Sequence, residues 1–168
     1  MELNELMSGF AAEIGLGEIS ANDTGAYWLR IDDFSVAFTA DEAGRTLVVY
    51  TTIGERDEVR AGGLADFLLE LNNLYVGSFG GTIALDREAG QYAYQRRVSL
   101  FDLDKDSFRA LVEDFVNRAE TLQDLIGKFF QTHAVAETAV ETVPETGGEA
   151  PVAEELLLGG LTSGFMQV

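Results

Sequence analysis

Four carboxylates at the start of the last helical segment have the spacing of a calcium-binding loop. Asp102, Asp104, Asp106 and Glu113 fit the first, third, fifth and twelfth positions, where oxygen ligands hold Ca²⁺. Ser107, however, replaces the turn glycine, and the residues before the loop alternate like a strand instead of repeating like a helix. Aspartates directly before an apolar helical repeat also cap helices. We therefore expect a helix cap here and no metal site.

The other reactive residue types lack the partners that catalysis needs. His133 is the only histidine, and we expect it at the end of the long helix, where its charge favours the helix dipole. Residues 77–81, GSFGG, lack the lysine of a phosphate-binding loop and predict a turn. Asp32 and Asp33 are turn residues by position, the serines lack a nucleophile elbow, and cysteine is absent. We expect neither catalysis nor a cofactor. The opposing hypothesis is a small hydrolase or calcium-dependent enzyme that uses the carboxylates.

The charge of the chain limits its partners. Its 168 residues include 29 acidic and 11 basic side chains, for a formal net charge of −18. Nucleic acid and anionic membranes are disfavoured, because both require clustered Lys and Arg. The pair Arg96-Arg97 is interpreted as a charged edge or a solvent-facing strand position. Residues 1–5 lack the basic start of a secretory signal, and no apolar run reaches about 20 residues. We expect a cytoplasmic protein without membrane insertion.

The hydrophobic periodicity predicts an α+β domain with the element order α-βββ-α-ββ-α and a twisted antiparallel sheet packed by helices. The expected helices span residues 3–16, 64–76 and about 104–131, and the expected strands span 26–31, 34–39, 46–53, 82–86 and 91–100. The second helix has a continuous apolar stripe that includes Leu64, Leu74 and Tyr75. The sheet or a second copy of the chain must cover such a stripe.

Composition changes after His133, which divides the chain into three regions. Residues 1–133 form the folded domain, 134–155 a flexible acidic linker, and 156–168 an apolar C-terminal segment. The apolar segment either docks on the chain itself or on its dimer partner, at the raised local concentration of a tethered ligand, or stays disordered.

Several of these segments together resemble the class I chaperones of bacterial type III secretion, the Tir/CesT-like family. They are the helix LNELMSGFAAEIGL, the strand pair WLRIDDFSVAF, the Leu71-Asn72 pair in LLELNNLY, Gly80-Gly81 before TIALD, the strand YAYQRRVSL and the long terminal helix. The resemblance implies a cytoplasmic homodimer that uses no nucleotide. It further implies that the protein holds the N-terminal segment of a secreted effector in extended form and keeps it competent for export.

The resemblance also implies two groups of binding residues. Effector-binding positions are expected at Leu3, Leu6, Phe10, Ile14, Trp28, Val36 and Phe38. Dimer contacts are expected at Leu68, Leu71, Tyr75, Tyr92 and Tyr94. Packing in the core of the chain is the alternative at each position. A non-secretory regulatory module that binds proteins through the same fold is the alternative function.

Overall fold

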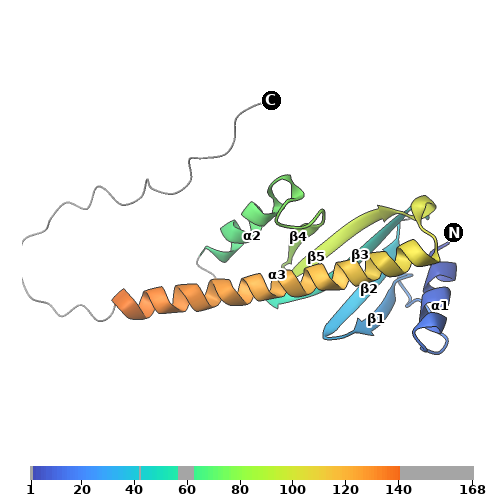
Figure 1. Ribbon diagram of the computed structural model, residues 1–168, viewed down its shortest axis with the longest axis horizontal. Helices are drawn as coiled ribbons and strands as arrows, with labels where there is room; N and C mark the ends of the chain where they lie inside the picture. Colours follow the sequence, from blue (N-terminus) through green and yellow to red (C-terminus); the bar gives the residue numbers. More distant parts are fainter. Residues whose placement is uncertain (1, 42, 57–62, 141–168) are drawn as a thin grey trace, which may run out of the picture.

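A computed structural model describes residues 2–41, 43–56 and 63–140, and it has the predicted element order (Figure 1). The helices are α1 (Leu3–Glu13), α2 (Leu64–Asn72) and α3 (Lys105–Val140), with short 3-10 turns η1 (Asn73–Tyr75) and η2 (Leu100–Asp102). The strands are β1 (Tyr27–Ile31), β2 (Phe34–Ala40), β3 (Thr46–Glu55), β4 (Thr82–Asp86) and β5 (Gln91–Ser99). The α+β fold predicted from the periodicity is confirmed.

The five strands form one antiparallel sheet in the order β1-β2-β3-β5-β4. β1 and β4 are therefore the two edge strands, and β5 lies inside the sheet. Burial alternates along β3, where Leu47, Val49 and Ile53 are fully buried while Val48 and Tyr50 keep part of their surface exposed. This alternation defines a core face and an opposite face of the sheet.

The core lies between the sheet and α3, which crosses the sheet in Figure 1. The Phe115 ring stacks on Tyr94 of β5, with centroids 5.0 Å apart. The Phe108 ring contacts both Phe38 of β2 and Phe10 of α1, so α1 packs on the same face of the sheet as α3. Because α3 contacts strands and helices far apart in the sequence, it organises the whole core.

The second helix ends earlier than its apolar stripe predicted, at Asn72. The Asn72 side chain acts as a strand partner for β4, since its amide group donates to the Ile83 carbonyl and accepts from the Ile83 N–H, both at 2.9 Å. Leu74 and Tyr75 follow with left-handed backbone angles, φ 53° and 58°. The prediction that they continue the helical stripe is wrong, because this side-chain pairing takes the chain out of the helix.

Two glycines let the chain fold back after η1. A Cβ at Gly77 would lie 2.8 Å from the Cα of Leu71, and a Cβ at Gly81 would overlap the ring of Tyr94. Such approaches of backbone to backbone or to a buried ring admit only glycine. The turn predicted at residues 77–81 is confirmed, and close packing explains its composition.

The third helix runs nine residues beyond its predicted end at Gln131, to Val140. His133 therefore lies inside the helix, and its expected position at a helix end is wrong. The flexible linker predicted for 134–155 lies outside the described residues from 141 onward, as does the whole apolar segment 156–168. In the described part of the chain, no helix combines the length and the apolar character needed to span a bilayer.

Candidate functional site

The predicted effector-binding residues divide into a buried and an exposed group. Leu3, Leu6, Phe10, Val36 and Phe38 lie in the core, with 8% or less of their surface exposed. Ile14 and Trp28 keep 47% and 46% of their surface exposed. The buried residues thus support the surface from beneath, and the exposed residues are available to a partner.

Of the exposed pair, Trp28 lies on the edge strand β1, and Ile14 directly follows the last residue of α1. β1 is an edge strand whose outer main-chain groups pair with no described strand. The Tyr27 hydroxyl at the start of β1 donates to Asn4 Oδ1 of α1 at 2.9 Å, which fixes the helix against this edge. Leu16, 44% exposed after the end of α1, belongs with Ile14 and was not predicted. Its exposure could have been inferred from the sequence, because Leu16 stands between Gly15 and Gly17, where the helix has already ended and cannot bury it.

The predicted dimer residues are also divided. Leu68, Tyr92 and Tyr94 are buried, Leu71 is half-buried, and Tyr75 is 61% exposed. The flanking Leu74 and Val76, which were not predicted, are 82% and 76% exposed. We call residues 74–76 the apolar loop. The feature of the sequence that indicates their exposure is the Asn72-Asn73 pair, because two residues of low helix propensity favour the end of the helix before Leu74.

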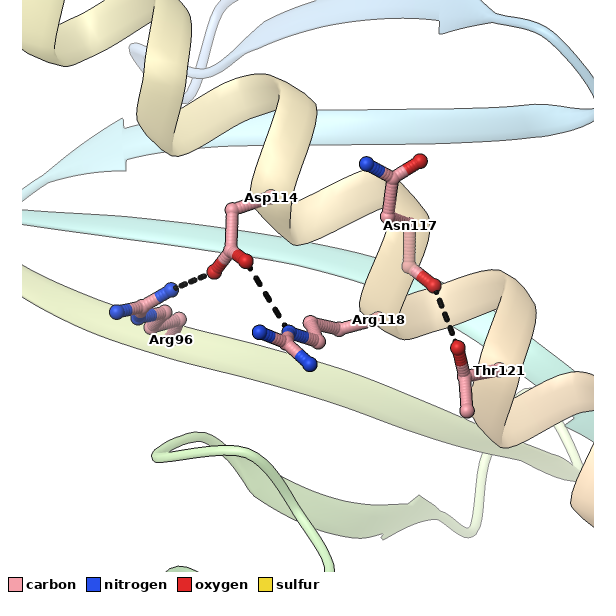
Figure 2. A network of polar contacts seen from close by, with 5 residues as sticks. All are labelled: Arg96, Asp114, Asn117, Arg118 and Thr121. Atoms are coloured by element: carbon pink, nitrogen blue, oxygen red, sulfur yellow. Dashed lines mark hydrogen bonds and ion pairs between the residues drawn. The ribbon is translucent and has the colours of Figure 1, made fainter.

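A network of charged groups lies between β5 and α3 (Figure 2). Asp114 accepts from Arg96 of β5 at 2.7 Å and from Arg118, one helical turn further on, at 3.1 Å. The Arg118 guanidinium also lies over the Phe79 ring, 4.7 Å from its centroid. Arg96 therefore points to the helix and is not the free edge residue that its sequence suggested, whereas Arg97 is exposed to solvent.

Two further polar groups lie in this region. In Figure 2, Thr121 donates to the Asn117 carbonyl at 2.8 Å along the exposed side of α3. The hydroxyl of Tyr94 is buried and has no hydrogen-bond partner in the described part of the chain. Burial raises the pKa of this phenol. The contacts of Asp114 and Arg118 hold α3, β5 and the turn before β4 together, whereas the Tyr94 hydroxyl takes no part in them.

The helix cap predicted before α3 is confirmed. The Ser107 N–H donates to Asp104 Oδ1 and the Asp104 N–H donates to Ser107 Oγ, both at 2.8 Å. Hydrogen bonds from Ser107 hold the pKa of Asp104 below its ordinary value. Across residues 2–41, 43–56 and 63–140, no group of three or more His, Cys, Asp or Glu side chains is arranged to hold a metal ion.

The sequence matches the family described as Tir chaperone protein (CesT) over residues 5–123. The chain belongs to this family, so the resemblance seen in its segments is confirmed. The family is one of chaperones, whose members bind other proteins. Comparison with curated proteins gave no match.

Three solved structures share the fold. The ExsC–ExsE complex contains a chain that is 22% identical, with a TM-score of 0.66, covering 75% of this chain and 97% of that one. The HopA1–SchA chaperone–effector complex gives 16% identity and a TM-score of 0.56, covering 71% and 91%. The Yersinia pestis type III secretion chaperone SycH, in complex with a fragment of YscM2, gives 22% identity and a TM-score of 0.55, covering 71% and 98%.

Proposed function

We propose that this protein is a cytoplasmic type III secretion chaperone that binds the N-terminal segment of a secreted effector in extended form and keeps it export-competent. Membership of the CesT family supports this proposal, as does the likeness to a chain of a chaperone–effector complex. The observation that carries it is the free β1 edge with half-exposed Trp28 on it, in a strongly acidic domain that also exposes Ile14 and Leu16 after the end of α1. Catalysis is not part of the proposal.

The β1 edge suits an extended polypeptide. A segment that adds to a sheet edge gains main-chain hydrogen bonds, and its alternate side chains contact the residues that flank the edge. Apolar side chains of the effector would cover Ile14 and Leu16 at the end of α1. The high negative charge keeps such an open apolar surface soluble while no effector is bound.

Co-expression with the N-terminal segments of secreted proteins encoded beside this chaperone tests the function directly. We expect one segment to co-purify at fixed stoichiometry, and mass spectrometry to show that it stays bound. If each neighbouring segment purifies without the chaperone, the proposal is overturned.

The binding residues are tested by the double variant Ile14→Gln with Leu16→Gln. Both side chains are half-exposed, so the fold keeps its core. The contact with the effector segment loses about 2–3 kcal/mol, or about 30- to 150-fold in Kd. Isothermal titration with the co-purified segment measures this loss. Leu85→Gln, on the opposite edge strand β4, is the matched control and should bind normally. An unchanged Kd for the double variant would place the binding surface elsewhere.

We also propose that the chain forms a homodimer through the apolar loop. Three consecutive residues, Leu74, Tyr75 and Val76, are each more than 60% exposed, and the first two have positive φ angles. Leucine and tyrosine gain nothing locally from such a conformation. A second copy of the loop provides an apolar cover, and a self-complementary contact closes as a dimer.

A further inference from the structure

One face of the sheet has no described helix over it. α1 and α3 pack on the core face, and α2 contacts the β4 edge and the side of α3. The opposite face, which we call the open sheet face, presents side chains from all five strands. Its central row pairs Trp28 with Ala37 and Ala37 with Tyr50. The rings of Trp28 and Tyr50 meet edge to face, with centroids 5.4 Å apart, and Trp28 is 46% exposed.

Arginines flank this aromatic row on both sides. In the row on one side, Thr39 pairs with Val48 and Val48 with Arg97. In the row on the other side, Arg30 pairs with Ser35. Both arginines are exposed and neither forms an ion pair with a described residue. The Arg30 Nε donates to the Asp32 carbonyl at 3.3 Å. In a chain of net charge −18, the open sheet face therefore combines an aromatic strip with two arginines that have no carboxylate partner among the described residues.

The C-terminal 28 residues have the complementary chemistry. Residues 141–155 contain five glutamates and no basic residue, and residues 156–168 contain six large apolar side chains, among them Leu156, Leu157 and Leu158, and no charge. An apolar segment of this kind gains free energy by covering an apolar strip, and the glutamates before it attract the flanking arginines.

The tail is long enough to reach this face. From Phe115, which lies over the sheet, to Val140 the helix axis is about 38 Å long at about 1.5 Å per residue. The chain from Val140 to Leu156 spans at most about 55 Å when extended. The extended chain is about 17 Å longer than this part of the helix, so the tail can return along α3 past the level of Phe115.

We propose that residues 156–168 dock on the open sheet face of the same chain, over Trp28 and Tyr50, with the glutamates of 141–155 beside Arg30 and Arg97. The docked tail covers apolar surface that the described residues leave open, and its linker keeps it at high local concentration. Trp28 also belongs to the proposed effector surface, so a docked tail and an effector would compete for it. The test of docking requires no effector, and its failure would leave the proposed function standing.

The single tryptophan makes the test direct, because Trp28 lies in the proposed docking site. Quenching of its fluorescence by acrylamide, a neutral quencher unaffected by the charge of the protein, is measured in the full chain and in the triple variant Leu156→Gln, Leu157→Gln and Leu158→Gln. We expect a quenching constant several-fold lower in the natural chain. The matched control is Thr142→Gln, Thr146→Gln and Thr162→Gln, which changes three polar tail residues and should quench like the natural chain.

Two further measurements test whether the chain's own tail, and not a second copy of the chain, binds the open sheet face. The double variant Arg30→Gln with Arg97→Gln should expose Trp28 more, because the glutamates of the tail lose their two cationic partners. Protection of Trp28 should be independent of protein concentration. Equal quenching in the natural chain and the leucine variant overturns the proposal, as does protection that grows with concentration, because a second copy would then be the occupant.

Discussion

At the scale of single residues, Tyr94 shows where close packing overrides hydrogen bonding. Its ring fills the space between Phe115 and Gly81, and its hydroxyl is left buried without a partner. The sequence indicated an apolar strand position, which burial confirms. It could not indicate the unpartnered hydroxyl, because that depends on a glycine thirteen residues earlier and on a helix residue that follows the strand.

The variant Tyr94→Phe should therefore stabilise the protein. Removing a desolvated hydroxyl without a partner is expected to raise the free energy of unfolding by about 1 kcal/mol, measured by urea denaturation at neutral pH. Because burial raises the pKa of Tyr94, the unfolded chain loses this proton first as the pH rises above the ordinary value of 10.0. The natural chain then loses stability and the gap to the variant widens.

Tyr92→Phe is the matched control on the same strand and should give no comparable gain. A loss of stability in Tyr94→Phe would show that the hydroxyl has a partner, such as an ordered water.

At the scale of elements, the periodicity of apolar residues predicted the three α-helices and five strands of the described residues, because each of these elements buries one face. It failed where a contact between distant residues decides the end of an element. Asn72 ends α2 by pairing with the main chain of Ile83, and no local pattern contains that contact. The exposed residues Leu74 and Val76 follow from this break, so the sequence alone did not identify them as surface residues.

The cap of α3 gives a prediction at this scale. Asp104→Ala should lower the midpoint of thermal unfolding, because the N–H of Ser107 loses its acceptor at the helix that organises the core. Asp104→Asn retains an acceptor and should remain close to the natural chain. The pKa of Asp104 is lowered in the folded state, so its contribution is present above the ordinary value of 3.8 and is lost as the pH falls below it.

The difference between Asp104→Ala and the natural chain should accordingly shrink in acid. Added calcium should leave the midpoint of the natural chain unchanged. A calcium-dependent rise that Asp104→Asn abolishes would instead support the loop-like spacing of the carboxylates as a metal site.

At the scale of the whole molecule, the charge and the exposed apolar residues have to be considered together. Apolar surface remains open at the β1 edge, on the open sheet face and at the apolar loop. Surfaces of this kind normally cause association. A net charge of −18 opposes indiscriminate association, and so favours contacts in which each patch has a specific cover. We propose that an effector binds the β1 edge, that the C-terminal tail binds the open sheet face, and that a second copy of the chain binds the apolar loop.

The double variant Leu74→Asn with Val76→Gln tests whether the chain dimerises through the apolar loop. Both side chains are exposed in the single chain, and asparagine tolerates the positive φ of position 74 better than leucine, so the monomer should remain folded. Each dimer would lose four apolar contacts, which weakens association by at least about 100-fold. Sedimentation should show a dimer for the natural chain and a monomer for the variant, with unchanged circular dichroism. A natural chain that sediments as a monomer, or a variant that stays dimeric, would exclude the loop as the dimer contact.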